Sequence, residues 1–173
     1  LNLEMATTEE MLRIALQVKP DVVTLVPERP EELTTEGGLD VVKNFPLIKK
    51  RITRLKNAGI TTSIFIEADR EQIEKAKEAG ADKVELNTDG YARRWRRSGK
   101  ELERIKEKAK YSSGIGLRVH AGHGLDYWNI IPIAQIPEIE GFSIGFAIVA
   151  RAVLVGLKEA VSEMKRLVCA TAS

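Results

Sequence analysis

Short apolar segments alternate with amphipathic segments along the whole chain, and this alternation constrains the fold more than any single motif. The apolar segments are predicted to be strands, at residues 1–4, 21–26, 61–66, 83–87, 116–119 and 141–145. The segments between them carry apolar residues at helical spacing. Strands that are apolar throughout are buried on both faces, so the pattern predicts a parallel sheet covered by helices.

Capping residues mark where several helices begin. Thr7 is expected to cap the first helix, with Glu10 completing a capping box, and Asp69 with Gln72 forms a similar pair. Further helices are predicted over 46–58, 101–110 and 147–167. The last of these is expected to bury five apolar side chains: Val149, Leu154, Leu157, Val161 and Met164.

The chain contains about six β-α units within its 173 residues, a length that fits one domain. A closed (β/α)₈ barrel requires eight units, so both an incomplete TIM barrel and an open sheet are compatible with this count. Neither the G-x-G-x-x-G nor the G-x-x-x-x-G-K-[ST] motif occurs, which disfavours the nucleotide-binding α/β folds.

Composition narrows the class of protein further. The net charge of +2 is too small to indicate nucleic-acid or membrane binding, and no apolar run approaches the roughly 20 residues of a membrane span. The single cysteine, Cys169, excludes an internal disulfide framework and suits a reducing compartment. The basic cluster 93–97 is interpreted as a solvated loop rather than a phosphate or nucleic-acid site.

Polar residues stand where the predicted strands end. In chain order they are Glu4, Glu28, Glu67, Glu85 and His123, and the last strand ends at Gly145. The carboxyl ends of parallel barrel strands meet on one face, where active sites are built, so several acids and a histidine there predict a polar active site. Glu67 is set aside as a loop-capping residue, and Glu28 as a surface residue.

Two of these residues carry the most specific expectations. Glu85 alternates with apolar neighbours and is expected to point into the barrel, where burial raises the pKa of a carboxyl into the range for acid–base catalysis. Glu4 has the same relation to its neighbours. His123 lies between Gly122 and Gly124 and suits proton transfer, although a loop histidine held by a local hydrogen bond fits equally.

A metal site is not expected. His120 and His123 are three residues apart, and an extended strand would direct them to opposite faces. Cys169 lies far along the last predicted helix, so no zinc ligand set forms.

An anion site is expected where the last strand meets its helix, at Gly145, Phe146 and Ala147. Backbone amides at a helix N-terminus attract phosphate, and a glycine allows close approach. An ordinary strand–helix turn explains the same residues. Gly124 offers a further amide.

Several longer runs resemble one enzyme family, the pyridoxine 5′-phosphate synthases of the deoxyxylulose-dependent vitamin B6 pathway. They occur in order as residues 2–6 (NLEMA), 25–28 (LVPE), 33–40 (LTTEGGLD), 121–125 (AGHGL), 136–139 (IPEI), 151–153 (RAV) and 163–167 (EMKRL). The resemblance implies a TIM barrel that condenses 3-amino-2-oxopropyl phosphate with 1-deoxy-D-xylulose 5-phosphate. It also implies a cytoplasmic homo-oligomer, an octamer, that acts on small phosphorylated molecules and needs no bound cofactor.

The resemblance also implies roles for individual residues. Glu4 matches a catalytic base, His123 a proton donor and Glu85 a carboxylate that stabilises the transition state. The substrate contacts that match are Thr34, Gly124, Gly145 and Phe146.

The sequence departs from the family pattern in four respects. Asn87 and Phe146 stand where the family usually has histidine, and Asp89 replaces a usual glycine near a phosphate site. The family's first two β-α units precede Leu1, so residues 1–173 are expected to form a single, N-terminally incomplete barrel domain. We expect these residues alone to lack turnover, since the edge strands of an open barrel are unpaired.

Two alternatives remain. One is a different TIM-barrel lyase or isomerase that acts on phosphosugars, which a substrate panel would distinguish. The other is an inactive fragment that closes its sheet by self-association. Replacing His123 with Asn should abolish turnover in either enzyme and change nothing in the inactive fragment.

Overall fold

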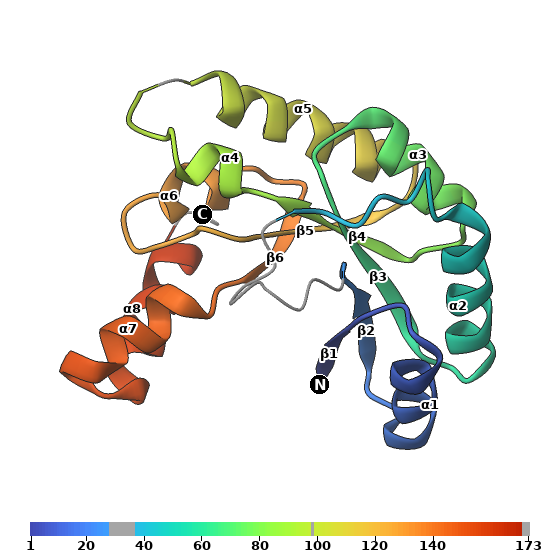
Figure 1. Cartoon of the computed structure of the whole chain (residues 1–173). Helices are drawn as coiled ribbons and strands as arrows, with labels where there is room; N and C mark the ends of the chain where they lie inside the picture. Colours follow the sequence, from blue (N-terminus) through green and yellow to red (C-terminus); the bar gives the residue numbers. More distant parts are fainter. Residues whose placement is uncertain (28–36, 98, 171–173) are drawn as a thin grey trace.

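Six parallel strands form one curved sheet whose spatial order follows the chain, β1-β2-β3-β4-β5-β6 (Figure 1). The computed structural model describes residues 1–27, 37–97 and 99–170. The strands are β1 (Asn2–Met5), β2 (Val22–Leu25), β3 (Thr61–Ile66), β4 (Lys83–Asn87), β5 (Arg118–Gly122) and β6 (Ile139–Ser143). All six predicted strands are confirmed, and the largest differences are in β5 and β6, whose bounds shift by two or three residues.

Helices follow the strands and cover the outer face of the curved sheet. They are α1 (Glu9–Val18), α2 (Phe45–Asn57), α3 (Arg70–Glu78), α4 (Asp89–Ala92), α5 (Lys100–Gly114), α6 (Ile130–Ala134), α7 (Phe146–Val155) and α8 (Leu157–Cys169). Figure 1 shows α1, α2, α3 and α5 around the outside of the sheet, whereas α7 and α8 project from the end formed by β6. The architecture is a curled half-barrel of the TIM type, as the alternation predicts.

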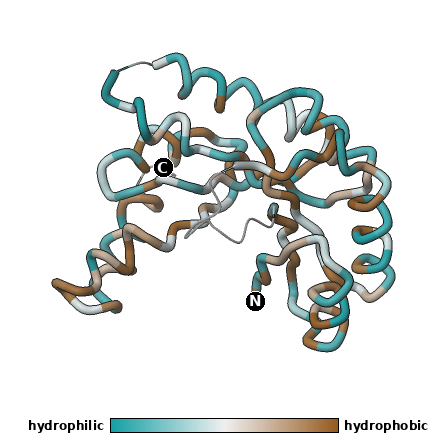
Figure 2. The backbone as a smooth tube through the Cα atoms, viewed as in Figure 1, coloured by the Kyte–Doolittle hydropathy of each residue, from teal (hydrophilic) through white to brown (hydrophobic). Residues whose placement is uncertain are grey.

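The apolar core lies between the sheet and the outer helices. Alternate strand residues such as Val23, Ile64, Val84 and Val119 are fully buried there against helix residues that include Leu12. Figure 2 shows the same division, with hydrophobic residues toward the sheet and hydrophilic residues outside on α2, α3 and α5.

The inner, concave face of the sheet is polar. Register pairs Phe65 with Glu85 and Glu85 with His120, so these side chains share one row of that face. A neighbouring row aligns Glu4 with Thr24 across β1 and β2. A parallel sheet therefore presents its acids and histidine on the face that the outer helices leave free.

The first helix is capped by a different residue from the one predicted. Thr8, not Thr7, accepts a hydrogen bond from the Met11 backbone N–H at 3.2 Å. The Thr7 carbonyl instead accepts a bond from Arg51 Nε at 2.9 Å. The Thr7 backbone thus bonds to Arg51 of α2, and the adjacent Thr8 is the residue that caps α1. The Asp69 cap is confirmed, because its side chain accepts from the N–H groups of Glu71 and Gln72.

The last helix differs most from the prediction. It is two helices, because Gly156 takes φ 82° and separates α7 from α8. Met164 is buried as predicted, but the prediction of inward-facing residues is wrong for Val149, Leu154, Leu157 and Val161, which are all exposed. Together with Phe146 and Val153, these four residues form an exposed apolar face, here called the α7–α8 face. Helical spacing identifies an apolar stripe but not what covers it.

Within the described residues, β1 and β6 each pair with one strand only, so the sheet is open at both ends. None of the helices described there combines the length and the apolar character that a membrane span requires.

Candidate active site

Glu85 is the most deeply buried acid of the concave face. It lies in the middle of β4 with 2% of its surface exposed. Its Oε2 accepts a hydrogen bond from the Ser143 hydroxyl of β6 at 2.8 Å. Its Oε1 is buried and has no hydrogen-bond partner among the described residues. A buried carboxyl with one satisfied oxygen is unusual, because unpaired buried polar atoms cost free energy.

Burial raises the pKa of Glu85 from 4.5 to about 7, with the negative charge of Glu4 adding to the rise and the Ser143 hydrogen bond opposing it. The predicted inward orientation and raised pKa are both confirmed. A carboxyl that titrates near neutral pH is able to give up or take a proton during turnover.

Gly122 provides the space that Glu85 occupies. A Cβ built on Gly122 would lie 2.1 Å from Glu85 Oε1 and 3.1 Å from Ser143 Cβ. Any larger residue would displace the carboxyl. The glycine was predicted as part of a turn, whereas its main structural requirement is this close approach across the β4–β5 pair.

Glu4 lies on β1, three strands along the sheet from Glu85 on β4. Its charge is one of the causes of the raised Glu85 pKa, so the two carboxyls interact electrostatically. Glu4 itself is exposed, in row with Thr24 of β2. The pair therefore combines one exposed carboxyl with one buried carboxyl, the arrangement that separates acid and base roles.

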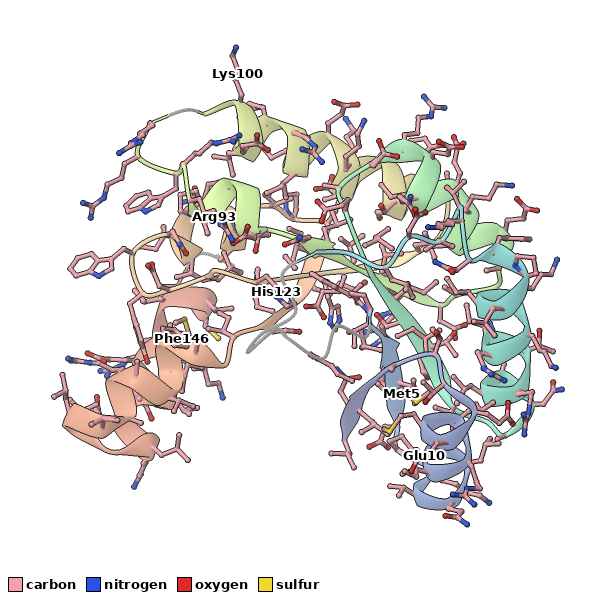
Figure 3. All side chains as sticks on the ribbon, in the orientation of Figure 1. Met5, Glu10, Arg93, Lys100, His123 and Phe146 are labelled. Carbon is pink, nitrogen blue, oxygen red and sulfur yellow. The ribbon has the colours of Figure 1, made fainter. Side chains whose placement is uncertain are left out.

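His123 follows directly after β5 and takes a left-handed backbone conformation with φ 77°. Its ring lies 4.0 Å from the ring of Phe65, measured between centroids. Because Phe65 pairs in register with Glu85, His123 lies over the same face as both carboxyls. Figure 3 shows His123 at the centre of the curved sheet, between Met5 at the end of β1 and Phe146 at the start of α7.

Thr88 fixes the backbone that carries His123. Its fully buried hydroxyl lies 2.6 Å from the carbonyl oxygens of both Gly122 and His123, and its N–H donates to the Gly122 carbonyl at 2.8 Å. A non-glycine residue at positive φ is strained, and such hydrogen bonds hold it in place. Thr88 follows a predicted strand, yet its partners are 34 and 35 residues away, so no local pattern identifies it.

His120 and His123 both lie on the concave face, so the predicted divergence is wrong. His120 shares the row of Glu85, and Gly141 makes room for its ring, with a built Cβ 2.9 Å from His120 Cε1. The strand alternation ends at Gly122 and does not reach His123. Burial, together with the positive charges of Lys83 and Arg118, lowers the pKa of His120.

Glu67, which sequence reasoning set aside, belongs to the same rim. Its Oε1 accepts from Asn87 Nδ2 at 2.7 Å and from the Gly38 N–H at 3.0 Å. It thereby joins the ends of β3 and β4 to the segment that begins at residue 37. Glu28 and Thr34 lie outside the described residues.

Gly124, Gly145 and Phe146 occupy the two turns where phosphate contacts are predicted. Gly124 has φ 72°, and its carbonyl accepts from Asn129 Nδ2 at 2.9 Å. Gly145 precedes α7 with open space where a Cβ would stand, and Phe146 is 82% exposed at the first position of α7. Within the described residues, no packing contact requires glycine at 145.

The basic cluster 93–97 forms contacts within the chain. Arg93 pairs with Asp89 at 2.8 Å and Arg94 with Glu101 at 3.3 Å. All four arginines of the cluster are exposed, which agrees with a solvated loop. The cluster lies around α4 and α5 rather than on the concave face.

Comparison with solved structures shows the fold. A KDPGal structure superimposes with a TM-score of 0.60 at 14% identity, covering 94% of this chain and 68% of that chain. An HpcH/HpaI aldolase from Desulfitobacterium hafniense superimposes with a TM-score of 0.59, also at 14% identity, over 99% of this chain and 73% of the aldolase.

Comparison with curated proteins finds much closer relatives. A protein of Chlorobium phaeobacteroides named pyridoxine 5'-phosphate synthase is 54% identical over 170 residues, which cover 97% of this chain and 72% of the relative. The protein of the same name from Prochlorococcus marinus is 52% identical over 169 residues, covering 97% and 69%. The profile of the family described as pyridoxal phosphate biosynthesis protein PdxJ matches residues 1–170. The chain is therefore a member of the PdxJ family.

Proposed function

We propose that this protein is a pyridoxine 5′-phosphate synthase. It condenses 3-amino-2-oxopropyl phosphate with 1-deoxy-D-xylulose 5-phosphate and releases pyridoxine 5′-phosphate, inorganic phosphate and water. The observation that carries the proposal is the buried acid Glu85 beside Glu4 and His123 on one concave face, in a chain 54% identical to a protein of that name.

The proposed chemistry uses repeated proton transfer, since imine formation, dehydration and ring closure each move protons. Glu4 is assigned the role of base, because an exposed carboxylate is available to accept protons. His123 is assigned the role of proton donor. Glu85 is assigned the stabilisation of the transition state, through a carboxyl on the same face that shares its proton with the reacting group.

The substrate phosphates are proposed to bind at the turns that follow β5 and β6. Gly145 and Phe146 offer backbone amides at the N-terminus of α7, a helix of 10 residues, and Gly124 offers another after β5. Thr34 is proposed to contact deoxyxylulose phosphate. The helix dipole and the unpaired amides of a first turn both favour an anion.

The remaining properties are proposed from the family. We propose that the protein is a cytoplasmic homo-oligomer, an octamer. It acts on small phosphorylated molecules without a bound cofactor, and it binds neither membrane nor nucleic acid. The α7–α8 face supports self-association, because contiguous exposed apolar surface marks interaction sites.

The function is tested with the purified protein, produced at the full length of its gene. Incubation with both phosphorylated substrates should give pyridoxine 5′-phosphate and inorganic phosphate, detected by mass spectrometry and a phosphate assay. His123→Asn should abolish product without changing the circular dichroism spectrum. Turnover of another phosphosugar without the aminoketone, or unchanged turnover in His123→Asn, would contradict the proposal.

The phosphate assignment has its own test. Gly145→Ala should fold normally because no atom of the described residues lies within 4 Å of the added Cβ. Its KM for the aminoketone phosphate should rise at least several-fold if the substrate approaches that backbone. An unchanged KM would remove Gly145 from the site.

A further inference from the structure

We propose that Ser143 is a positioning residue for Glu85: its hydroxyl holds Oε2 and leaves Oε1, beside the Gly122–His123 backbone, as the oxygen that exchanges a proton during turnover. This inference rests on the proposed function for its catalytic meaning, but not for its geometry. It also assigns a catalytic role to β6, in addition to the space that Gly141 leaves for the His120 ring.

The first argument is the distribution of contacts on the carboxyl group. Ser143 Oγ on β6 lies 2.8 Å from Glu85 Oε2 on β4, with one strand, β5, between them in the sheet and 58 residues between them in the chain. Oε1 has no hydrogen-bond partner among the described residues and is buried. A serine hydroxyl donating to Oε2 therefore makes the two oxygens inequivalent and leaves one for a reacting group.

The second argument is the packing that fixes this orientation. Gly122 pairs in register with Ser143, and the position of a Cβ on Gly122 lies 2.1 Å from Oε1 and 3.1 Å from Ser143 Cβ. The carboxyl is thus held between a hydrogen-bond donor on β6 and a side-chain-free backbone on β5. The next residue after Gly122 is His123, so Oε1 faces the segment that carries the proposed proton donor.

The third argument is electrostatic. Hydrogen bonding from Ser143 favours the ionised form of Glu85, whereas burial and the charge of Glu4 favour the protonated form. Ser143 therefore keeps the Glu85 pKa from rising further above neutrality. Without the hydroxyl, the carboxyl would stay protonated over more of the working pH range.

The test follows the titration of Glu85 directly by ¹³C NMR of the glutamate side-chain carboxyls, with the resonance assigned from Glu85→Gln. Ser143→Ala should raise the Glu85 pKa by on the order of one pH unit, the size expected for losing a hydrogen bond to a charged group. Ser143→Thr keeps the hydroxyl and should restore the wild-type value. Ser143→Cys keeps the shape with a weak donor and should behave as Ser143→Ala, which covers a failure of the alanine variant to fold.

A matched control is Ser63→Ala. Ser63 is a buried serine of β3 that pairs in register with Lys83, and its hydroxyl is not a hydrogen-bond partner of Glu85 in the described residues. This control should leave the Glu85 titration unchanged. If Ser143→Ala or Ser143→Cys also leaves it unchanged, the positioning role is wrong.

Activity supplies the second measurement. In Ser143→Ala, the pH–kcat profile should move to higher pH by the same amount as the NMR titration, while KM stays within about twofold. If the Glu85 titration shifts in Ser143→Ala but the wild-type protein catalyses no condensation, the proposed function is wrong. The positioning of Glu85 by Ser143 then still stands. If wild-type protein is active and neither the titration nor the profile moves in the variants, this inference alone is overturned.

Discussion

Glu85 shows how a single residue can favour chemistry at the expense of stability. Burial of its carboxyl raises the pKa to about 7, so the folded protein holds a proton that the unfolded chain releases near pH 4.5. Between these values the folded state binds more protons, so the free energy of unfolding falls as pH rises. Gly122 offers no side chain to Glu85 Oε1, which has no hydrogen-bond partner among the described residues.

This linkage predicts the behaviour of Glu85→Gln. Between pH 4.5 and pH 8.5, the free energy of unfolding of the wild-type protein should fall by up to about 3 kcal/mol because folded Glu85 loses its proton. The amide of Glu85→Gln does not titrate, so this variant should not show that fall. Urea unfolding at several pH values measures the difference between the two proteins. Glu10→Gln, which removes an exposed glutamate of α1 away from the concave face, is the matched control for the substitution. Parallel curves for wild type and Glu85→Gln would show that Glu85 is not the titrating group.

Gly122→Ala should be damaging because its Cβ would occupy the position of the Glu85 carboxyl, 2.1 Å from Oε1. We expect destabilisation of about 1–3 kcal/mol from overpacking, and loss of turnover from the displaced acid. Gly145→Ala is the matched control for stability, since an added Cβ there meets no atom of residues 1–27, 37–97 or 99–170 within 4 Å. Equal melting temperatures for the two variants would contradict the close approach.

At the scale of elements, the last two helices show where local pattern fails. An apolar sequence from 146 to 157 continues helical spacing through Gly156, and the sequence alone predicts one long helix. The structure breaks it because Gly156 takes φ 82° and ψ 152°, a region that is open essentially only to glycine. The break lets α8 turn back and pack on α6, which brings Met164 and Ala160 into the buried set.

Gly156→Ala tests this break. The substitution should destabilise the protein by about 1–3 kcal/mol, because alanine is strained in that backbone region. Gly114→Ala, at the last residue of α5, adds a Cβ with no neighbour within 4 Å in the part of the chain that the structure describes, and should instead be neutral or stabilising by up to about 1 kcal/mol. Thermal denaturation followed by circular dichroism compares them. Stabilisation by Gly156→Ala would mean that α7 and α8 form one continuous helix in solution.

At the scale of the whole molecule, the sheet is curved and open, with a polar inner face and an apolar helical hairpin at one end. Figure 1 shows this hairpin projecting from the β6 end, and Figure 2 shows that much of its backbone carries hydrophobic residues. Val153 is 82% exposed and Leu154 79% exposed. Such contiguous apolar exposure is expected to be covered in the assembled protein.

Val153→Glu should therefore weaken self-association without unfolding the protein. The side chain is exposed, so stability should change by less than about 0.5 kcal/mol. Sedimentation velocity across a concentration series should show a shift toward smaller species. Val18→Glu, at an exposed position on α1 outside the α7–α8 face, should leave the distribution unchanged. An identical distribution for Val153→Glu and wild type would exclude this face from the interface.

The sequence by itself determined the six β-α units, the Asp69 cap, the inward orientation of Glu85 and the family resemblance, because these depend on periodicity and on ordered local motifs. Only the tertiary structure decided which threonine caps α1 and which face of α7 is exposed. It also decided which residues position Glu85 and His123 in the candidate site. Ser143, Thr88 and Gly122 act on partners 34 to 58 residues away, or across a strand pair. Such contacts depend on strand register and sheet curvature, which arise only when the sheet has assembled.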